Sequence, residues 1–114
     1  MYRSLSIACA LLATVAVAGL AGCTNSTGIT EQQIACPTDS TLTYASFGQQ
    51  VISDNCLSCH ESRERPRLST QAEVQANANS IIDEAVFSSS MPQDSNMADD
   101  VRIQLGQWLR CGAP

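Results

Sequence analysis

The chain has 114 residues, with six cysteines, no lysine, and eleven carboxylates against six arginines. Its formal net charge of −5 argues against nucleic acid as a partner, because phosphate backbones bind basic surfaces. Aromatic residues make up 4% of the sequence, and a single domain of this size buries only a modest core. We therefore expect one small domain that needs cross-links or a bound group for stability.

The N-terminus has the pattern of an export signal. Arg3 precedes an apolar run over residues 5–20, which is shorter than the roughly 20 residues of a membrane span. The run ends in Leu20-Ala21-Gly22-Cys23, which resembles the lipobox of bacterial lipoproteins. That resemblance implies that residues 1–22 are a signal peptide and that Cys23 is lipidated and anchors the protein to a membrane. An ordinary cleaved signal or an uncleaved helix is the alternative.

Polar residues follow the predicted lipidation site. We expect residues 23–35 to form a lipid-anchored flexible tether, spanning roughly 20 Å, and residues 36–114 to form the folded domain. Thr24 stands where an aspartate would indicate retention in the inner membrane, by analogy with enteric bacteria. The expected location is the periplasmic face of a bacterial envelope, with the outer membrane favoured over the inner.

The folded part is predicted to be all-α, because no alternating strand pattern competes with the helical spacings. Tyr44, Phe47 and Val51 recur three and four residues apart, which places them on one helix face. Thr70 followed by Glu73 is typical of a capping box at a helix start. The predicted helices cover residues 43–55, 70–77, 80–87 and 96–110.

A Cys-x-x-Cys-His motif follows the first predicted helix. In an exported protein, Cys56-Leu57-Ser58-Cys59-His60 predicts one covalently attached haem c. The Cys56 and Cys59 thiols would add to the two vinyl groups, and His60 would bind the iron as the proximal ligand. A thioredoxin-like dithiol and a zinc site are the alternatives. The first lacks a βαβ pattern, and the second lacks another close cysteine pair.

The sixth iron ligand must come from a small set of residues. His60 is the only histidine and lysine is absent, which leaves Met91 and Met97. Met91 precedes Pro92, whose fixed backbone angle stiffens the loop, so we expect Met91 to be the distal ligand and Met97 to pack. An open or water-bound iron is the third possibility and would suit a peroxidase-like enzyme or a gas sensor. A peroxidase would, however, want a general base such as a second histidine.

Two cysteines remain once the others are assigned. Cys9 lies in the predicted signal, Cys23 takes the lipid, and the motif cysteines take haem. Because disulfides persist outside the cytoplasm, we expect Cys36 and Cys111 to pair, which a chain-entropy model values at about 4 kcal/mol. Two free thiols are the alternative.

Arginines and a tryptophan are further candidates for contact with the cofactor. Arg63, Arg65 and Arg67 follow the motif, and an arginine there can pair with a haem propionate. Interleaved glutamates make a solvated loop an equal alternative. Trp108 is expected in the core of the last helix, with contact to a propionate or the haem edge as the second reading.

Over residues 43–114 the chain resembles a small class I type cytochrome c domain. The resemblance rests on the helix that ends at the haem motif, the Met91-Pro92 dipeptide, and a closing helix that ends in Trp-Leu-Arg-Cys-Gly-Ala-Pro. It implies a compact helical domain around one haem, and single-electron transfer between redox partner proteins without enzymatic bond chemistry. The acidic composition favours a partner with a basic docking surface. The stretch between His60 and Met91 is short for the family and implies a minimal haem-covering loop.

Overall fold

The computed structural model describes residues 25–114, so the predicted signal peptide and the lipidation site at Cys23 lie outside the described residues. Within that range the chain is helical, and its β structure is a single isolated bridge between Ser26 and Ser88. The all-α prediction is therefore confirmed. None of the helices in residues 25–114 has the length and apolar character needed to cross a membrane.

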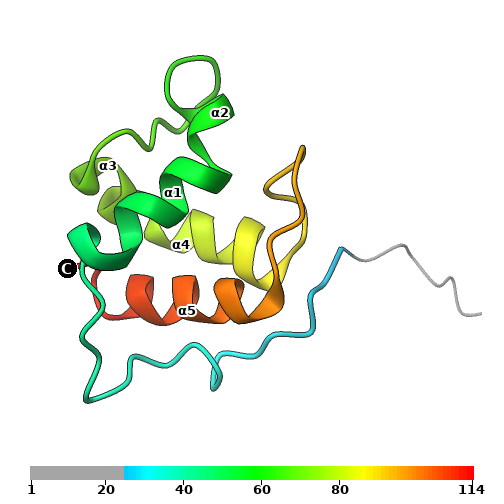
Figure 1. Cartoon of the computed structure of the whole chain (residues 1–114). Helices are drawn as coiled ribbons and strands as arrows, with labels where there is room; N and C mark the ends of the chain where they lie inside the picture. Colours follow the sequence, from blue (N-terminus) through cyan, green and yellow to red (C-terminus); the bar gives the residue numbers. More distant parts are fainter. Residues whose placement is uncertain (1–24) are drawn as a thin grey trace, which may run out of the picture.

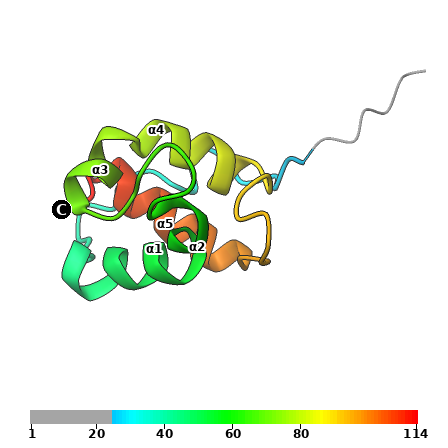
Figure 2. The same ribbon diagram turned by 90° about the horizontal axis from the view of Figure 1, so that it is seen from above.

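Seven short helical segments make up the domain. They are η1 (Tyr44–Gly48), α1 (Gln49–Asn55), α2 (Leu57–His60), α3 (Gln71–Ala76), α4 (Ala78–Ile81), η2 (Ile82–Phe87) and α5 (Asp99–Arg110). Segments η1 and α1 are continuous, as are α4 and η2. Seen from above, α1 and the α4–η2 rod lie on either side, with α5 passing beneath them (Figures 1 and 2). The loop before α3 and the loop after η2 both contribute residues to one pocket.

The predicted helices are found close to their expected bounds. Thr43 caps the first helix, and its side chain accepts a hydrogen bond from the Ser46 backbone N–H. The last helix begins at Asp99 and not at Asn96, because the preceding residue, Ala98, has extended backbone angles. Asp99 and Asp100 then occupy the first turn, where carboxylates stabilise the positive end of the helix dipole.

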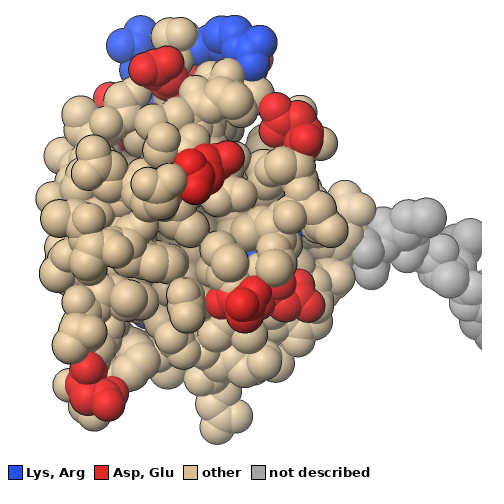
Figure 3. Space-filling model, viewed as in Figure 1, with Lys and Arg blue, Asp and Glu red and all other residues tan. Residues whose placement is uncertain are grey.

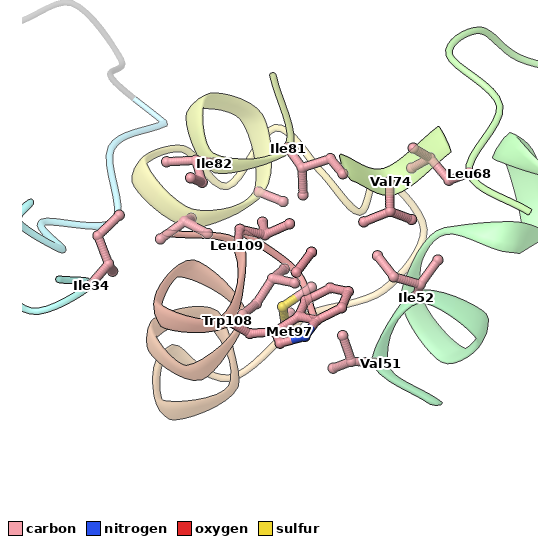
Figure 4. Packing of buried hydrophobic residues seen from close by; sticks show 14 residues of the cluster. Ile34, Val51, Ile52, Leu68, Val74, Ile81, Ile82, Met97, Trp108 and Leu109 are labelled. Carbon is pink, nitrogen blue, oxygen red and sulfur yellow. The ribbon is translucent and has the colours of Figure 1, made fainter. Parts of the chain in front are cut away.

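The core lies where the first helix crosses α5. Trp108 is fully buried and packs edge-on against Phe47, with ring centroids 6.0 Å apart. A Cβ on Gly48 would collide with the Trp108 ring, so the missing side chain permits this close approach. Val51, Met97 and Trp108 lie near one another on this side of the core (Figure 4).

The segment expected to be a free tether packs on the domain instead. Over residues 26–35 the chain runs along α5 (Figure 1), and Ile34 is fully buried. Ile34 fits against Gly106, where a Cβ would come within 2.6 Å of its Cγ2. At the other end of the segment, the Thr27 backbone N–H donates to the Phe87 carbonyl at 3.0 Å. The prediction of a flexible tether over residues 23–35 is thus wrong for the described part of that segment, because the Ile34 side chain packs against Gly106.

The remaining cysteine pair fastens the same region. The Cys36 and Cys111 sulfur atoms lie at disulfide-bonding distance, with Cα atoms 4.9 Å apart and a sequence separation of 75. This is the pairing that the cysteine assignment predicts. It joins the chain just after Ile34 to the end of α5.

Candidate cofactor site

A break in helix geometry presents the cysteine motif. Helix α1 ends at Asn55, and Cys56 leaves the helical region with φ −123° and ψ −37° before α2 begins. The chain stays compact there, since the His60 backbone N–H donates to the Cys56 carbonyl at 2.9 Å. One helical turn therefore separates Cys56 from Cys59 and His60, which brings all three side chains to one side.

That side of the motif opens on a pocket with a volume of about 620 Å³. Typical small-molecule and cofactor sites occupy roughly 300–1,000 Å³. The pocket lies between the motif, the loop after α2, the α4–η2 rod and the loop after η2. Its lining includes Cys56, Cys59, His60, Leu68, Ile81 and Met91. Sequence positions 35 residues apart thus share one cavity.

A backbone carbonyl holds the His60 ring in one tautomer. Its Nδ1 lies 2.7 Å from the Pro66 carbonyl oxygen. Because a carbonyl only accepts, Nδ1 carries the proton and donates, which leaves Nε2 with its lone pair available. A hydrogen bond of this kind is the usual outer partner of a metal-binding histidine, since it fixes the tautomer and the ring orientation. The Leu68 backbone N–H also donates to the His60 carbonyl, at 3.0 Å, and so closes the loop.

The environment of the two motif thiols differs from that of a catalytic dithiol. Burial raises the pKa of the Cys56 thiol to about 11. Reactive Cys-x-x-Cys pairs work through a thiol whose pKa is lowered, because the thiolate is the nucleophile. Desolvation of Cys56 therefore weighs against the thioredoxin-like alternative.

The zinc alternative also loses its ligands. A zinc site at the motif could have recruited Cys36 and Cys111, but these two lie at bonding distance from each other. Across residues 25–114, no three histidine, cysteine or carboxylate side chains are grouped as a metal site would require. A structural zinc site normally uses four such ligands.

The two methionines occupy different places. Met91 is half-buried and lines the pocket, together with Pro92. Met97 is 4% exposed and packs in the hydrophobic core, away from the pocket lining. The packing role expected for Met97 is therefore confirmed. Of the two candidates for the sixth ligand, Met91 is the one that the fold brings to the same cavity as His60.

Three exposed arginines lie in the loop that follows α2. Arg63 and Arg65 line the pocket, whereas Arg67 does not. All three are exposed, and basic atoms cluster at the top of the view over the loop that follows α2 (Figure 3). The Arg63 guanidinium donates to the Ser58 carbonyl at 2.8 Å, which holds it beside the motif. Trp108, by contrast, lies in the core, and its Nε1 points toward the Pro114 carbonyl at 3.4 Å.

The residues around the pocket fit a covalently attached haem. Two thiols, a histidine with its Nε2 free and a methionine thioether face one cavity with an apolar wall, and arginines stand at its rim. Thioether attachment uses two thiols, and His/Met is one of the established axial pairs for haem iron. The chemistry of this donor set matches that group better than a bare metal ion.

Two functional residues were missed by sequence reasoning. Pro66 supplies the carbonyl that orients His60, and nothing in the sequence marks a backbone acceptor of this kind. Arg102 is 2% exposed and sits beside the loop that carries Met91. The sequence indicates the burial of Arg102, because this residue stands three residues before Leu105 and seven before Leu109 on the same face of the last helix.

The chain matches no family model, no curated protein and no solved structure. The site must therefore be interpreted from its own residues.

Proposed function

We propose that the protein is a single-haem c-type cytochrome that passes single electrons on the extracytoplasmic side of a bacterial envelope, anchored through a lipid at Cys23. The observation that carries this proposal is the pocket that Cys56, Cys59, His60 and Met91 share. The export pattern of the N-terminus supports a location where covalent haem attachment and disulfide formation take place.

Each residue has a defined task in this function. Haem, when bound, supplies the one-electron couple. The Cys56 and Cys59 sulfurs hold it by thioether bonds, so that it is retained in both redox states. His60 is kept in one tautomer by the Pro66 carbonyl and offers Nε2 to the iron. Met91 offers a thioether, a ligand that raises the potential relative to a second histidine.

The rest of the pocket controls solvent and charge. Leu68, Ile81 and Ala85 are buried and form the apolar part of the lining, which keeps water from the cofactor and lowers the local dielectric. Arg63 and Arg65 stand at the rim, where a guanidinium can pair with a propionate and lower the cost of burying it. If His60 and Met91 both held the iron, no ligand position would remain for oxygen or peroxide, which favours an electron carrier over an enzyme.

The charges at the pocket rim also indicate the partner. Glu64, Glu84 and Asp94 line the same cavity. With Arg63 and Arg65 engaged by propionates, the surface that remains around the exposed cofactor edge is acidic. A redox protein with a basic docking surface is the matching partner, and its rate of electron exchange should fall steeply as ionic strength rises. A rate that is independent of salt would contradict this charge pairing.

Covalent haem is the first property to test. The full chain, produced with the bacterial c-type maturation system, should give one thioether-linked haem per protein by intact mass and by its haemochrome spectrum. Replacing both motif cysteines, in Cys56→Ala/Cys59→Ala, should abolish covalent attachment. The Cys36→Ser/Cys111→Ser variant is the matched control and should keep the haem. A wild-type protein without covalent haem would contradict the proposal.

The distal ligand is tested by a matched methionine pair. Met91→Ala should lose the weak long-wavelength absorption band of methionine-bound ferric haem and should bind carbon monoxide rapidly when reduced. Met97→Ala should keep the band, because Met97 packs in the core. Tight carbon monoxide binding by the wild-type protein would instead support a five-coordinate sensor or peroxidase-like enzyme. Survival of the band in Met91→Ala would show that another residue holds the iron.

A further inference from the structure

A buried arginine lies behind the loop that carries Met91. Arg102, on α5, is 2% exposed, and its guanidinium donates only to backbone carbonyls. Its Nε donates to Met97 at 3.0 Å and its Nη1 to Met91 at 2.9 Å. Nη1 also reaches the Ala85 carbonyl in η2 and the Ser88 carbonyl at 3.4 Å. One side chain therefore contacts the start, the middle and the end of the loop over residues 88–98.

This arrangement is an unusual use of a buried charge. Removing a guanidinium from water is costly, and buried charges are normally paired with carboxylates. Within residues 25–114 the one ion pair joins Arg110 to Glu31, so Arg102 is neutralised by carbonyl dipoles and not by an opposite charge. An aliphatic residue would fill the same helix position without that cost. The contacts to the loop are what the arginine adds.

The contacts converge on the backbone of Met91. Its N–H donates to the Glu84 carbonyl at 3.0 Å, and its own carbonyl accepts from Arg102. Both polar backbone groups of Met91 are therefore fixed, although the loop around it has no helix or strand. The loop rises beside the end of η2 and returns to α5 (Figure 1). Its ends are held by the same guanidinium that holds its centre.

We propose that Arg102 is a positioning residue that keeps the Met91 thioether in the pocket and raises the reduction potential through its buried charge. The inference rests on the proposed function, with Met91 as the distal ligand. A backbone already fixed in its bound conformation loses less entropy when its side chain binds, so a weak thioether ligand competes better with other ligands. A fixed positive charge in the interior disfavours the ferric state, which carries one more positive charge than the ferrous state.

Ligand exchange on the haem-loaded, full-length protein tests whether Arg102 holds Met91 in place. Imidazole is titrated into the ferric protein while the long-wavelength methionine band is followed. Arg102→Met should lower the midpoint imidazole concentration by about tenfold, the equivalent of one charged hydrogen bond. Arg102→Lys keeps a cation but not the forked donors, so its midpoint should fall between those of Arg102→Met and the wild type. Ile34→Ala is the control, because it removes buried contacts at Gly106, outside the pocket lining and the Arg102 hydrogen bonds, and should leave the midpoint unchanged.

The reduction potential separates positioning from a merely structural role. The potential should be lower than that of the wild type in Arg102→Met and close to the wild-type value in Arg102→Lys. It should equal the wild-type value in Ile34→Ala. If Arg102→Met does not take up haem, Arg102→Lys still carries the test through its lower imidazole midpoint. The wild type could show the methionine band while the Arg102 variants keep its imidazole midpoint and reduction potential. That result would overturn the positioning role of Arg102 and leave the cytochrome proposal standing. If the wild type lacked the methionine band, both Met91 ligation and the positioning role of Arg102 would be overturned.

Discussion

At the residue scale, two glycines in helices decide how closely segments approach. Gly48 faces the Trp108 ring, and Gly106 faces Ile34. Neither position needs a left-handed backbone, so the requirement is for space and not for conformational freedom. Glycine in a helix interior costs up to about 1 kcal/mol relative to alanine, and the close packing offsets that cost.

Gly48→Ala should therefore destabilise the protein in spite of its higher helix propensity. The added Cβ collides with the ring of Trp108, which is fully buried. We expect a loss of about 1–3 kcal/mol in the free energy of unfolding, measured by chemical denaturation. The exposed neighbour Gln49 provides the control, since Gln49→Ala should change stability by less than about 0.5 kcal/mol. Equal stability of the two variants would show that the Gly48 contact is unimportant.

At the element scale, α3 depends on its cap. The helix has six residues, which is below the length at which a helix is stable by itself. The Thr70 Oγ1 accepts from the Glu73 N–H at 3.2 Å, and the Glu73 carboxylate accepts from the Thr70 N–H at 3.0 Å. Val74, which is fully buried, is the residue that this cap keeps in the core.

Thr70→Ala should cost about 1 kcal/mol of stability, because it leaves a helix N–H without its acceptor. Thr70→Ser keeps the hydroxyl and should restore most of the loss. Thermal unfolding of the haem-loaded protein, followed by circular dichroism, measures both. If Thr70→Ala and Thr70→Ser unfold at the same temperature, the cap contributes nothing to the fold.

At the scale of the whole molecule, the N-terminal segment is part of the domain. Ile34 is buried against α5, the Gln107 side chain donates to the Gln33 carbonyl at 2.9 Å, and Arg110 pairs with Glu31 at 2.7 Å. Together with the hydrogen bond from the Ser89 N–H to the Asn25 carbonyl, these contacts hold residues 25–34 on the domain, so the lipid anchor proposed at Cys23 would start close to it. The domain would therefore be held closer to the membrane surface than a tether over residues 23–35 predicts.

Ile34→Ala tests this docking. In a free tether the substitution would be neutral, whereas in a packed segment it should cost about 2–5 kcal/mol through lost burial and the cavity left behind. Gln32, two residues earlier, is exposed, so Gln32→Ala should have little effect. Denaturant unfolding of the two variants distinguishes the cases. A neutral Ile34→Ala would restore the tether interpretation.

The link between Cys36 and Cys111 acts over the whole domain. Closing a loop with 75 residues of separation restricts the unfolded chain, which the chain-entropy model values at about 4 kcal/mol. Cys36→Ser/Cys111→Ser should therefore unfold at lower denaturant concentration, while its haem spectrum stays the same because the pair lies outside the pocket lining. Reduction of the wild type should produce a similar loss. Identical stability with and without reductant would contradict the link.

Sequence reasoning located the helices and the main candidate site because both depend on local signals. The Thr70–Glu73 capping box and the helical spacing of Tyr44, Phe47 and Val51 act within one or two turns of chain. The Cys-x-x-Cys-His motif is local too, since one helical turn brings its side chains together. The amino-acid order by itself therefore determines the helical class, the helix that leads into the motif, and the type of donor atoms available.

Only the tertiary structure decided which distant groups meet. Ile34 enters the core because Gly106 leaves room for it, the Pro66 carbonyl turns toward the His60 ring, and four carbonyls converge on Arg102. Spacing in the sequence does not encode these contacts, because each joins a side chain to a group whose position depends on how the helices cross or on how a loop folds. The choice of Met91 over Met97 belongs to the same group: packing buries one sulfur in the core and leaves the other at the pocket.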